Sequence, residues 1–220
     1  MMKRNQSGFT LIEIAIVLVI IGLLLGGVLK GQELINSAKV KNLATDFKNI
    51  PVYIYGYQDK FRALPGDDIA AVSHVGATAG HNGNANGVID GAWDSATPAD
   101  ETQMFWEHIR LAGLATGPTT GDLLPTNSVG GLIGLTNGGI NNPDPAYAGT
   151  PATALRGSYI LCSAGILGKF AKQLDIQMDD GNPIGGSMRS FSQTARGAAL
   201  TDPSANPLDD ATSYVVCMGV

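Results

Sequence analysis

Apolar residues form one long run near the start of the chain and a helical repeat directly after it. Residues 9–29 (FTLIEIAIVLVIIGLLLGGVL) contain one ionisable residue, Glu13. As a helix they would be ~32 Å long, which matches the ~30 Å hydrocarbon core of a membrane. Beyond Lys30 the apolar positions recur three or four residues apart on one helical face, with charged residues opposite. The pattern predicts one helix over residues 9–64, and its repeat is Val40, Leu43, Phe47, Ile50, Ile54, Tyr57, Phe61 and Leu64.

The remaining pattern predicts a short helix, three strands and long loops. Residues 97–114 favour a helix that Thr97 or Asp100 would cap, while residues 66–99 and 117–156 are rich in glycine and proline and favour loops. Strands are predicted at residues 158–164, 172–180 and 213–219, and the second resembles half of a hairpin whose turn is DDGNP. We therefore expect an α+β fold with the amphipathic part of the helix packed on an antiparallel sheet; a two-helix coiled coil is the alternative use of that apolar face.

Composition and charge exclude two classes of protein. Hydrophobic residues make up 44% of the 220 residues and charged residues 15%, so the chain has enough apolar side chains for a packed core and is not disordered. The net charge is −5, and it becomes −7 without residues 1–8, which carry two basic residues and no acidic one. A nucleic-acid partner is therefore not expected, because phosphate binding needs clustered Lys and Arg.

The residues before the apolar run form a short polar leader, MMKRNQSG. No A-x-A cleavage site follows the run, whereas the small residue Gly8 directly precedes it. Cleavage after Gly8 would remove the charged leader and keep the membrane segment. Lys3 and Arg4 place the N-terminus in the cytoplasm by the positive-inside rule, with the rest of the chain on the far side of the inner membrane.

The stretch SGFTLIEIAIVLVIIGLLLGG resembles the leader and N-terminal helix shared by type IV prepilins and type II secretion pseudopilins. The resemblance implies cleavage between Gly8 and Phe9 by a prepilin peptidase, N-methylation of Phe9 by the same enzyme and a role for Glu13 in assembly. It also implies an antiparallel sheet on the long helix, in which two late cysteines often form a bridge. A second, weaker resemblance links LDIQMDDGNPIGGSMR to a late strand and turn of pseudopilin-like proteins.

Glu13 is the position of the apolar run that most needs an explanation. A carboxylate in the apolar zone of a bilayer costs about 2–3 kcal/mol, so it is expected to be paired or functional. Cleavage would create an amine at Phe9 with a pKa of about 8, which is mostly charged at neutral pH. We expect the amine of an incoming subunit to meet Glu13 of its neighbour; an acid solvated by lipid headgroups is the alternative.

The only two cysteines, Cys162 and Cys217, lie in two of the predicted strands. A disulfide between them would close a long loop and stabilise the fold by about 4 kcal/mol on loop entropy, provided that the compartment is oxidising. Two separate buried thiols are the alternative.

Few residues suggest a metal or catalytic site. His74, His81 and His108 lack the spacing of a zinc site, and no catalytic motif or phosphate loop occurs, so we expect neither an enzyme nor a cofactor other than calcium. Trp93 and Phe105 are expected in the core. In NGNANGVID, polar residues alternate as in a calcium loop, although a metal-free turn is favoured because the twelfth position is not acidic. The candidate calcium ligands are Asn82, Asn84, Asn86, Asp90 and Asp94, with Asp67 or Asp68 as further donors.

The sequence therefore predicts a structural subunit with a leader (residues 1–8), a transmembrane and assembly helix (9–29), an amphipathic continuation (30–65) and a globular domain (66–220). It would assemble with copies or relatives into a type IV pilus or a type II secretion pseudopilus. A minor tip subunit that binds a surface or an exported protein through residues 66–156 is the first alternative. An anchored periplasmic enzyme with the same leader is the second.

Overall fold

The structure is a computed structural model that describes residues 11–138, 155–203 and 207–220. The chain divides into two compact units, Met1–Lys39 and Val40–Val220. The first unit contains the beginning of the long helix α1 (Leu11–Phe61), and the second contains the rest of that helix and every other element. The predicted Gly8 and Phe9 lie outside the described residues.

Helix α1 ends at Phe61, three residues before the predicted end, because Arg62 adopts a left-handed backbone conformation with φ of 57°. Pro51 lies inside the helix. From Val40 onward one face is buried, and it contains the predicted repeat as far as Tyr57: Val40, Leu43, Ala44, Phe47, Ile50, Ile54 and Tyr57. This face packs into the core of its own domain, so the expected packing on the sheet is confirmed.

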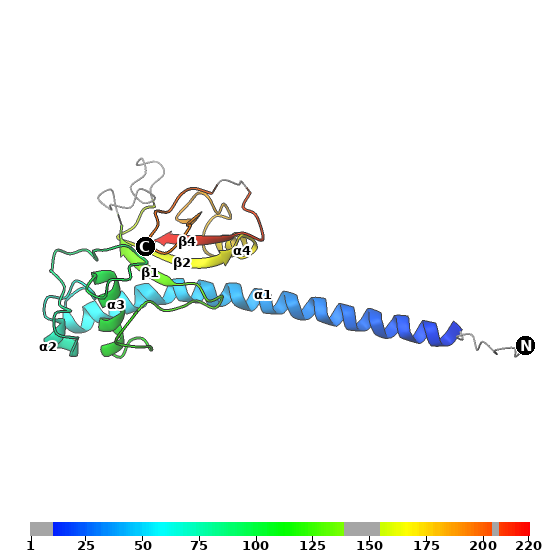
Figure 1. Ribbon diagram of the computed structural model, residues 1–220, viewed down its shortest axis with the longest axis horizontal. Helices are drawn as coiled ribbons and strands as arrows, with labels where there is room; N and C mark the ends of the chain where they lie inside the picture. The colour runs from blue at the N-terminus through cyan, green and yellow to red at the C-terminus, as the bar shows by residue number, and fades with distance from the viewer. Residues whose placement is uncertain (1–10, 139–154, 204–206) are drawn as a thin grey trace, which may run out of the picture. The chain divides into compact units, whose positions relative to one another are not determined.

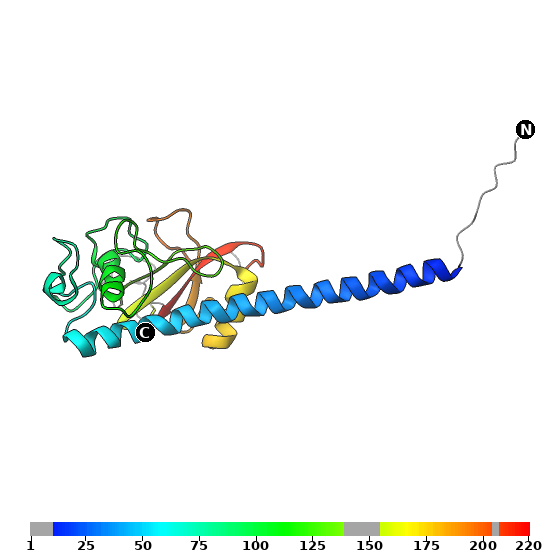
Figure 2. The same ribbon diagram turned by 90° about the horizontal axis from the view of Figure 1, so that it is seen from below.

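The sheet has four antiparallel strands in the order β1-β2-β4-β3. Figure 1 and Figure 2 show it along one side of the C-terminal part of α1, with α3 beside the same helix near its end in both views. The α+β, pilin-like layout is therefore confirmed. The strands are β1 (Ile133–Asn137), β2 (Tyr159–Leu167), β3 (Met188–Phe191) and β4 (Ser213–Gly219).

Side chains alternate between the two faces of the sheet, as the period of a strand requires. Leu161 on β2 and Val216 on β4 join the core shared with α1. Their neighbours Cys162 and Cys217 belong to a second core on the opposite face, where Trp93 and Phe191 also lie. Each face of the sheet is thus covered by its own layer of apolar side chains.

The strand predicted at residues 172–180 is wrong, because this segment belongs to helix α4 (Gly168–Met178). Alternation would place Leu174 and Ile176 on the same face, yet Leu174 is buried and Ile176 is 70% exposed. Phe170, Ala171 and Leu174 instead share one helical face and enter the core. The hairpin built on the predicted strand is therefore wrong as well, although β3 forms within its second half and pairs with β4.

Two further elements lie in segments that were predicted as loop. Strand β1 occupies part of residues 117–156, and its Gly134 lies so close to Trp93 that an added Cβ would be 1.8 Å from that residue's carbonyl oxygen. The glycines that suggested a loop here permit close backbone packing. The other element is α2 (Ala71–Val75), a short helix that ends at Gly76 with φ of 74°. Helix α3 (Glu101–Leu111) lies within its predicted segment, and Asp100 occupies the N-cap position, although its side chain makes no capping hydrogen bond.

Candidate functional site

The apolar part of α1 exposes its large side chains on all sides of the helix. Between Leu11 and Leu29 the large hydrophobic residues are 45–89% exposed and form a continuous run. On the surface of a water-soluble protein, exposed hydrophobic residues are usually isolated from one another. Among the described residues, α1 is the one helix long and apolar enough to cross a membrane. A surface of this kind needs lipid or the apolar faces of other helices to cover it.

Glu13 lies in the first turn of α1 and is exposed. Its negative charge favours the helix here, because the N-terminal end of a helix has a partial positive charge. No other charged residue occurs in the helix before Lys30. In the sequence, Glu13 is four positions after Phe9, the residue at which the predicted cleavage would leave a new amine.

Cys162 and Cys217 form a disulfide, and they are paired directly across β2 and β4. Both cysteines are fully buried in the second core, next to Trp93 and Phe191. The bond connects positions 55 residues apart in the sequence. It therefore joins the two central strands of the sheet on the face opposite α1.

The five candidate calcium ligands do not converge on one point. Asn84 and Asn86 each donate a side-chain hydrogen bond to Asp90, at 3.1 and 2.7 Å. Asn82 accepts a bond from the Val72 amide, and Asp94 accepts bonds from Gln193 and the Gly197 amide. N–H donors thus bind one oxygen each of Asp90 and Asp94, and Asn82 and Asp94 bond other segments of the chain, which favours the metal-free turn.

The histidines belong to hydrogen-bonded networks, in which His108 is buried, His81 is partly buried and His74 is exposed. His74 contacts Asp68, to which Tyr57 also donates a bond, and His81 contacts Glu107. The remaining histidine, His108, is buried and accepts a hydrogen bond from the Gly66 amide. Burial lowers the pKa of His108, which favours the neutral ring that this bond requires. All three histidines therefore tie loop residues 66–81 to α1 and α3.

Most buried carboxylates in the described parts of the chain are well hydrogen-bonded. Burial alone would raise the pKa of Glu107, but bonds from His81 and Thr78 outweigh it, and the pKa lies below the usual value. Asp175 on α4 is the exception, since neither of its oxygens accepts a hydrogen bond of good geometry. Burial, together with the charges of Asp179 and Asp180, raises its pKa to about 6 and outweighs the opposing effect of the Gly181 and Asn182 backbone amides. The sequence pattern predicted a strand over residues 172–180 and therefore gave no role to Asp175.

Comparison with known proteins bears on the N-terminal segment. Residues 3–29 match the family model of the prokaryotic N-terminal methylation motif. No curated protein and no solved structure matches the chain significantly.

The long apolar helix and the antiparallel sheet place the chain in the class of pilin-like α+β proteins. The motif at residues 3–29 is the signature of type IV prepilins and pseudopilins, so the N-terminal segment of the chain is pilin- or pseudopilin-like. This signature marks structural proteins rather than enzymes.

Proposed function

We propose that this protein is a structural subunit of a type IV pilus or a type II secretion pseudopilus. The observation that carries the proposal is an apolar helical surface, exposed from Leu11 to Leu29, within a segment that matches the methylation motif. A filament core of packed N-terminal helices would cover that surface after the subunit leaves the membrane.

The proposal divides the chain into four parts. Residues 1–8 are the leader that prepilin peptidase removes between Gly8 and Phe9, and residues 9–29 are the membrane and assembly helix. Residues 30–65 continue that helix, and residues 66–220 form the globular domain on the periplasmic side of the inner membrane. Lys3 and Arg4 support this orientation, because positive charges remain on the cytoplasmic side.

Glu13 is the assembly residue in this proposal. The amine created at Phe9 of an incoming subunit forms an ion pair with Glu13 of a neighbour in the filament. In an environment without water such a pair is strong, and it offsets the cost of placing a carboxylate among apolar helices.

Mass spectrometry of the mature protein tests the processing step. We expect an N-terminus at methylated Phe9. Gly8→Val should block cleavage, because a branched side chain replaces the small residue at the scissile bond. Gly27→Val is the matched control and should be processed normally, since an added Cβ at Gly27 meets nothing within 4 Å. An intact Met1, or cleavage after Leu29, would refute the proposal.

A deletion strain distinguishes the two filament systems. Loss of surface filaments assigns the subunit to a type IV pilus, whereas loss of protein export with filaments intact assigns it to a type II secretion system.

A further inference from the structure

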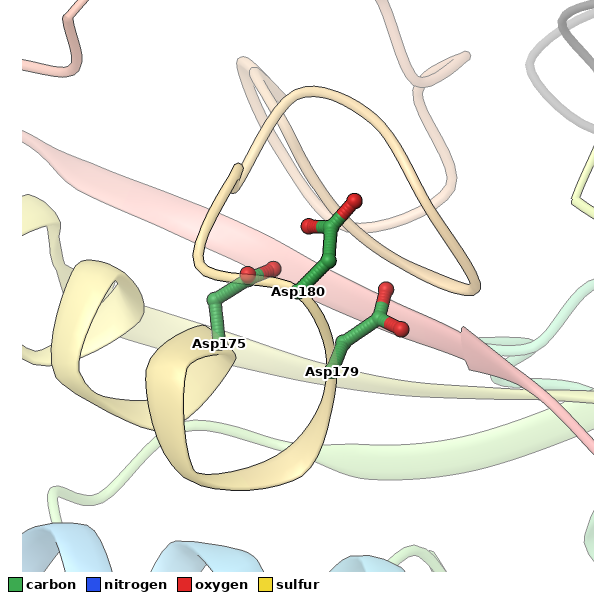
Figure 3. Close-up of side chains that lie close together, drawn as sticks. All are labelled: Asp175, Asp179 and Asp180. Carbon is green, nitrogen blue, oxygen red and sulfur yellow. The ribbon is translucent and has the colours of Figure 1, made fainter.

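Three aspartates lie together where α4 ends. Asp175 is in the last turn of the helix, and Asp179 and Asp180 follow it. One carboxylate oxygen from each residue lies within 4.8 Å of the other two. Figure 3 shows the three side chains extending from the end of α4 toward the loop that follows. Three negative charges are thus concentrated at one point of the surface.

Asp175 has an environment that differs from that of every other buried carboxylate in the described residues. It is 1% exposed, and neither oxygen accepts a hydrogen bond of good geometry, although the backbone amides of Gly181 and Asn182 approach closely enough to lower its pKa in part. Burying a carboxylate without a partner costs several kcal/mol. The other buried carboxylates each accept at least two hydrogen bonds; they are Asp67, Asp68, Asp94, Glu101 and Glu107.

No basic side chain compensates this charge. Among the described residues, neither Asp175, Asp179 nor Asp180 forms an ion pair with Lys, Arg or His. A buried anion beside two further anions is stable only if a cation binds or a proton neutralises it. The structure therefore contains a partly buried anionic site.

Hydrogen bonds from the loop orient the carboxylates of Asp179 and Asp180 and leave some of their acceptor sites unused. Asp179 accepts bonds from the Met188 amide and the Ser187 hydroxyl, both at 2.8 Å. Asp180 accepts one from the Asn182 amide at 2.8 Å through a single oxygen. A carboxylate has about four lone-pair sites, so these bonds leave acceptor capacity for a cation.

We propose that Asp175, Asp179 and Asp180 bind a calcium ion. All three donors are hard oxygens, with no histidine or cysteine among them, which favours calcium or magnesium over zinc. Magnesium prefers a regular octahedron at ~2.0–2.1 Å and keeps several waters. Calcium accepts irregular carboxylate sets at ~2.3–2.6 Å and suits a helix end followed by a loop.

Calcium links α4 to the loop before β3 in this proposal. Asp175 belongs to the helix, while Asp179 is bonded to the first residue of β3, Met188. Binding therefore fixes the connection between the helix and the edge strand. This site is separate from the loop of residues 82–94, in which the one buried carboxylate, Asp94, accepts two hydrogen bonds.

Calcium titration of the full-length protein in detergent at pH 7.5 tests the proposal. A calcium site outside the cytoplasm typically has a Kd of about 10⁻⁴–10⁻³ M. At 10 mM calcium we expect Tm to rise by roughly 3–8 °C relative to the chelator EGTA. Magnesium at the same concentration should give a clearly smaller rise. Isothermal titration calorimetry should report one calcium per chain.

Two variants assign the site. Asp175→Asn should abolish the calcium response and should not lower Tm in EGTA, because it removes an unpartnered buried charge. Asp180→Asn, at an exposed position, should weaken calcium binding about tenfold or more. This variant tests the site if Asp175→Asn does not fold. Asp59→Asn and Asp90→Asn are matched controls that make the same charge change elsewhere, and both should respond like the natural protein.

The outcomes are distinct. Loss of the calcium response in Asp90→Asn with retention in Asp175→Asn would overturn the proposal in favour of the asparagine-rich loop. An unchanged Tm and no calorimetric binding in the natural protein would also overturn it. Neither result affects the proposed processing at Phe9.

Discussion

At the scale of single residues, hydrogen bonds to buried carboxylates position the loops that follow α1. Glu107 accepts hydrogen bonds from both the amide and the hydroxyl of Thr78, each at 2.7 Å, and also contacts His81. Asp68 accepts bonds from Tyr57, His74 and the Ala70 amide, and these bonds keep its pKa low despite burial. The loop that follows α1 is thus held by hydrogen bonds to carboxylates rather than by a regular ladder of backbone hydrogen bonds.

Replacing Glu107 with Gln should destabilise the protein in a pH-dependent way. Gln keeps the shape but loses the charge, which we expect to cost about 1–2 kcal/mol at pH 7. Because the folded-state pKa of Glu107 is below its model-peptide value of 4.5, the carboxylate stabilises the fold above that pH. The contribution disappears as the pH falls through the lower, folded-state pKa. Thermal melts by circular dichroism at several pH values measure the difference.

The matched control is Glu33→Gln, at an acid whose side chain is 70% exposed and pairs only with Lys30. This change should leave Tm unaltered. A Tm difference between Glu107→Gln and the natural protein that stays constant from pH 7 to pH 3 would contradict the electrostatic explanation.

These residues also show what the sequence could not reveal. Glu107 and His81 are 26 positions apart, and nothing in their spacing predicts a contact. Asp175 was hidden for a different reason, since the local alternation of Leu174, Ile176 and Met178 resembled a strand. Only the burial of Phe170 and Ala171 beside Leu174 identifies the helix. Contacts of this kind depend on the tertiary fold rather than on a local pattern.

At the scale of elements, the disulfide and the strand ladder stabilise the same pair, β2 and β4. Cys162 is directly opposite Cys217, and Leu161 is opposite Met218 in the same register. The backbone hydrogen bonds between β2 and β4 specify the pairing of the strands even without the disulfide. The disulfide stabilises the fold by restricting the conformations of the unfolded chain.

Reducing or removing the disulfide should therefore weaken the fold without changing it. For a loop of 55 residues, the double variant Cys162→Ala/Cys217→Ala should lose about 2–4 kcal/mol of unfolding free energy. The midpoint of a urea denaturation curve should fall, while the circular dichroism spectrum of the folded protein stays the same. Reductant should lower the midpoint of the natural protein and leave that of the double variant unchanged. Two free thiols in the oxidised natural protein would contradict the prediction.

Element prediction succeeded where the periodicity was long and failed where it was short. The α1 repeat continues over six turns, so few other structures fit it, and the strand at residues 213–219 matches β4. Strand β1 has five residues in a glycine-rich segment, and its position depends on pairing with β2. A glycine such as Gly134 is compatible both with a strand that packs closely against another backbone and with a loop, and the sequence alone does not distinguish the two.

At the scale of the whole molecule, the two units of the chain need different environments: an apolar one for the first and water for the second. The unit Met1–Lys39 presents an apolar helix, while the unit Val40–Val220 buries most of its large apolar residues in two cores and exposes only scattered ones. The composition of residues 9–29 predicted the first of these directly. A subunit that moves from a membrane into a filament needs both properties, since one end is transferred between apolar environments and the other stays in water.

Replacing Glu13 with Gln tests the assembly step of the proposed function. Gln has the same shape and no charge, so the cost of insertion falls and membrane insertion should be unimpaired. The ion pair with the Phe9 amine of a neighbouring subunit would be absent, and we expect at least a tenfold loss of protein in sheared filaments. Quantitative immunoblots of the membrane and filament fractions measure the two steps separately. Glu33→Gln, which removes an acid beyond the apolar run, is the control and should assemble normally. Normal filament yield from Glu13→Gln would refute the pairing, whereas reduced membrane levels would show that the acid acts during insertion instead.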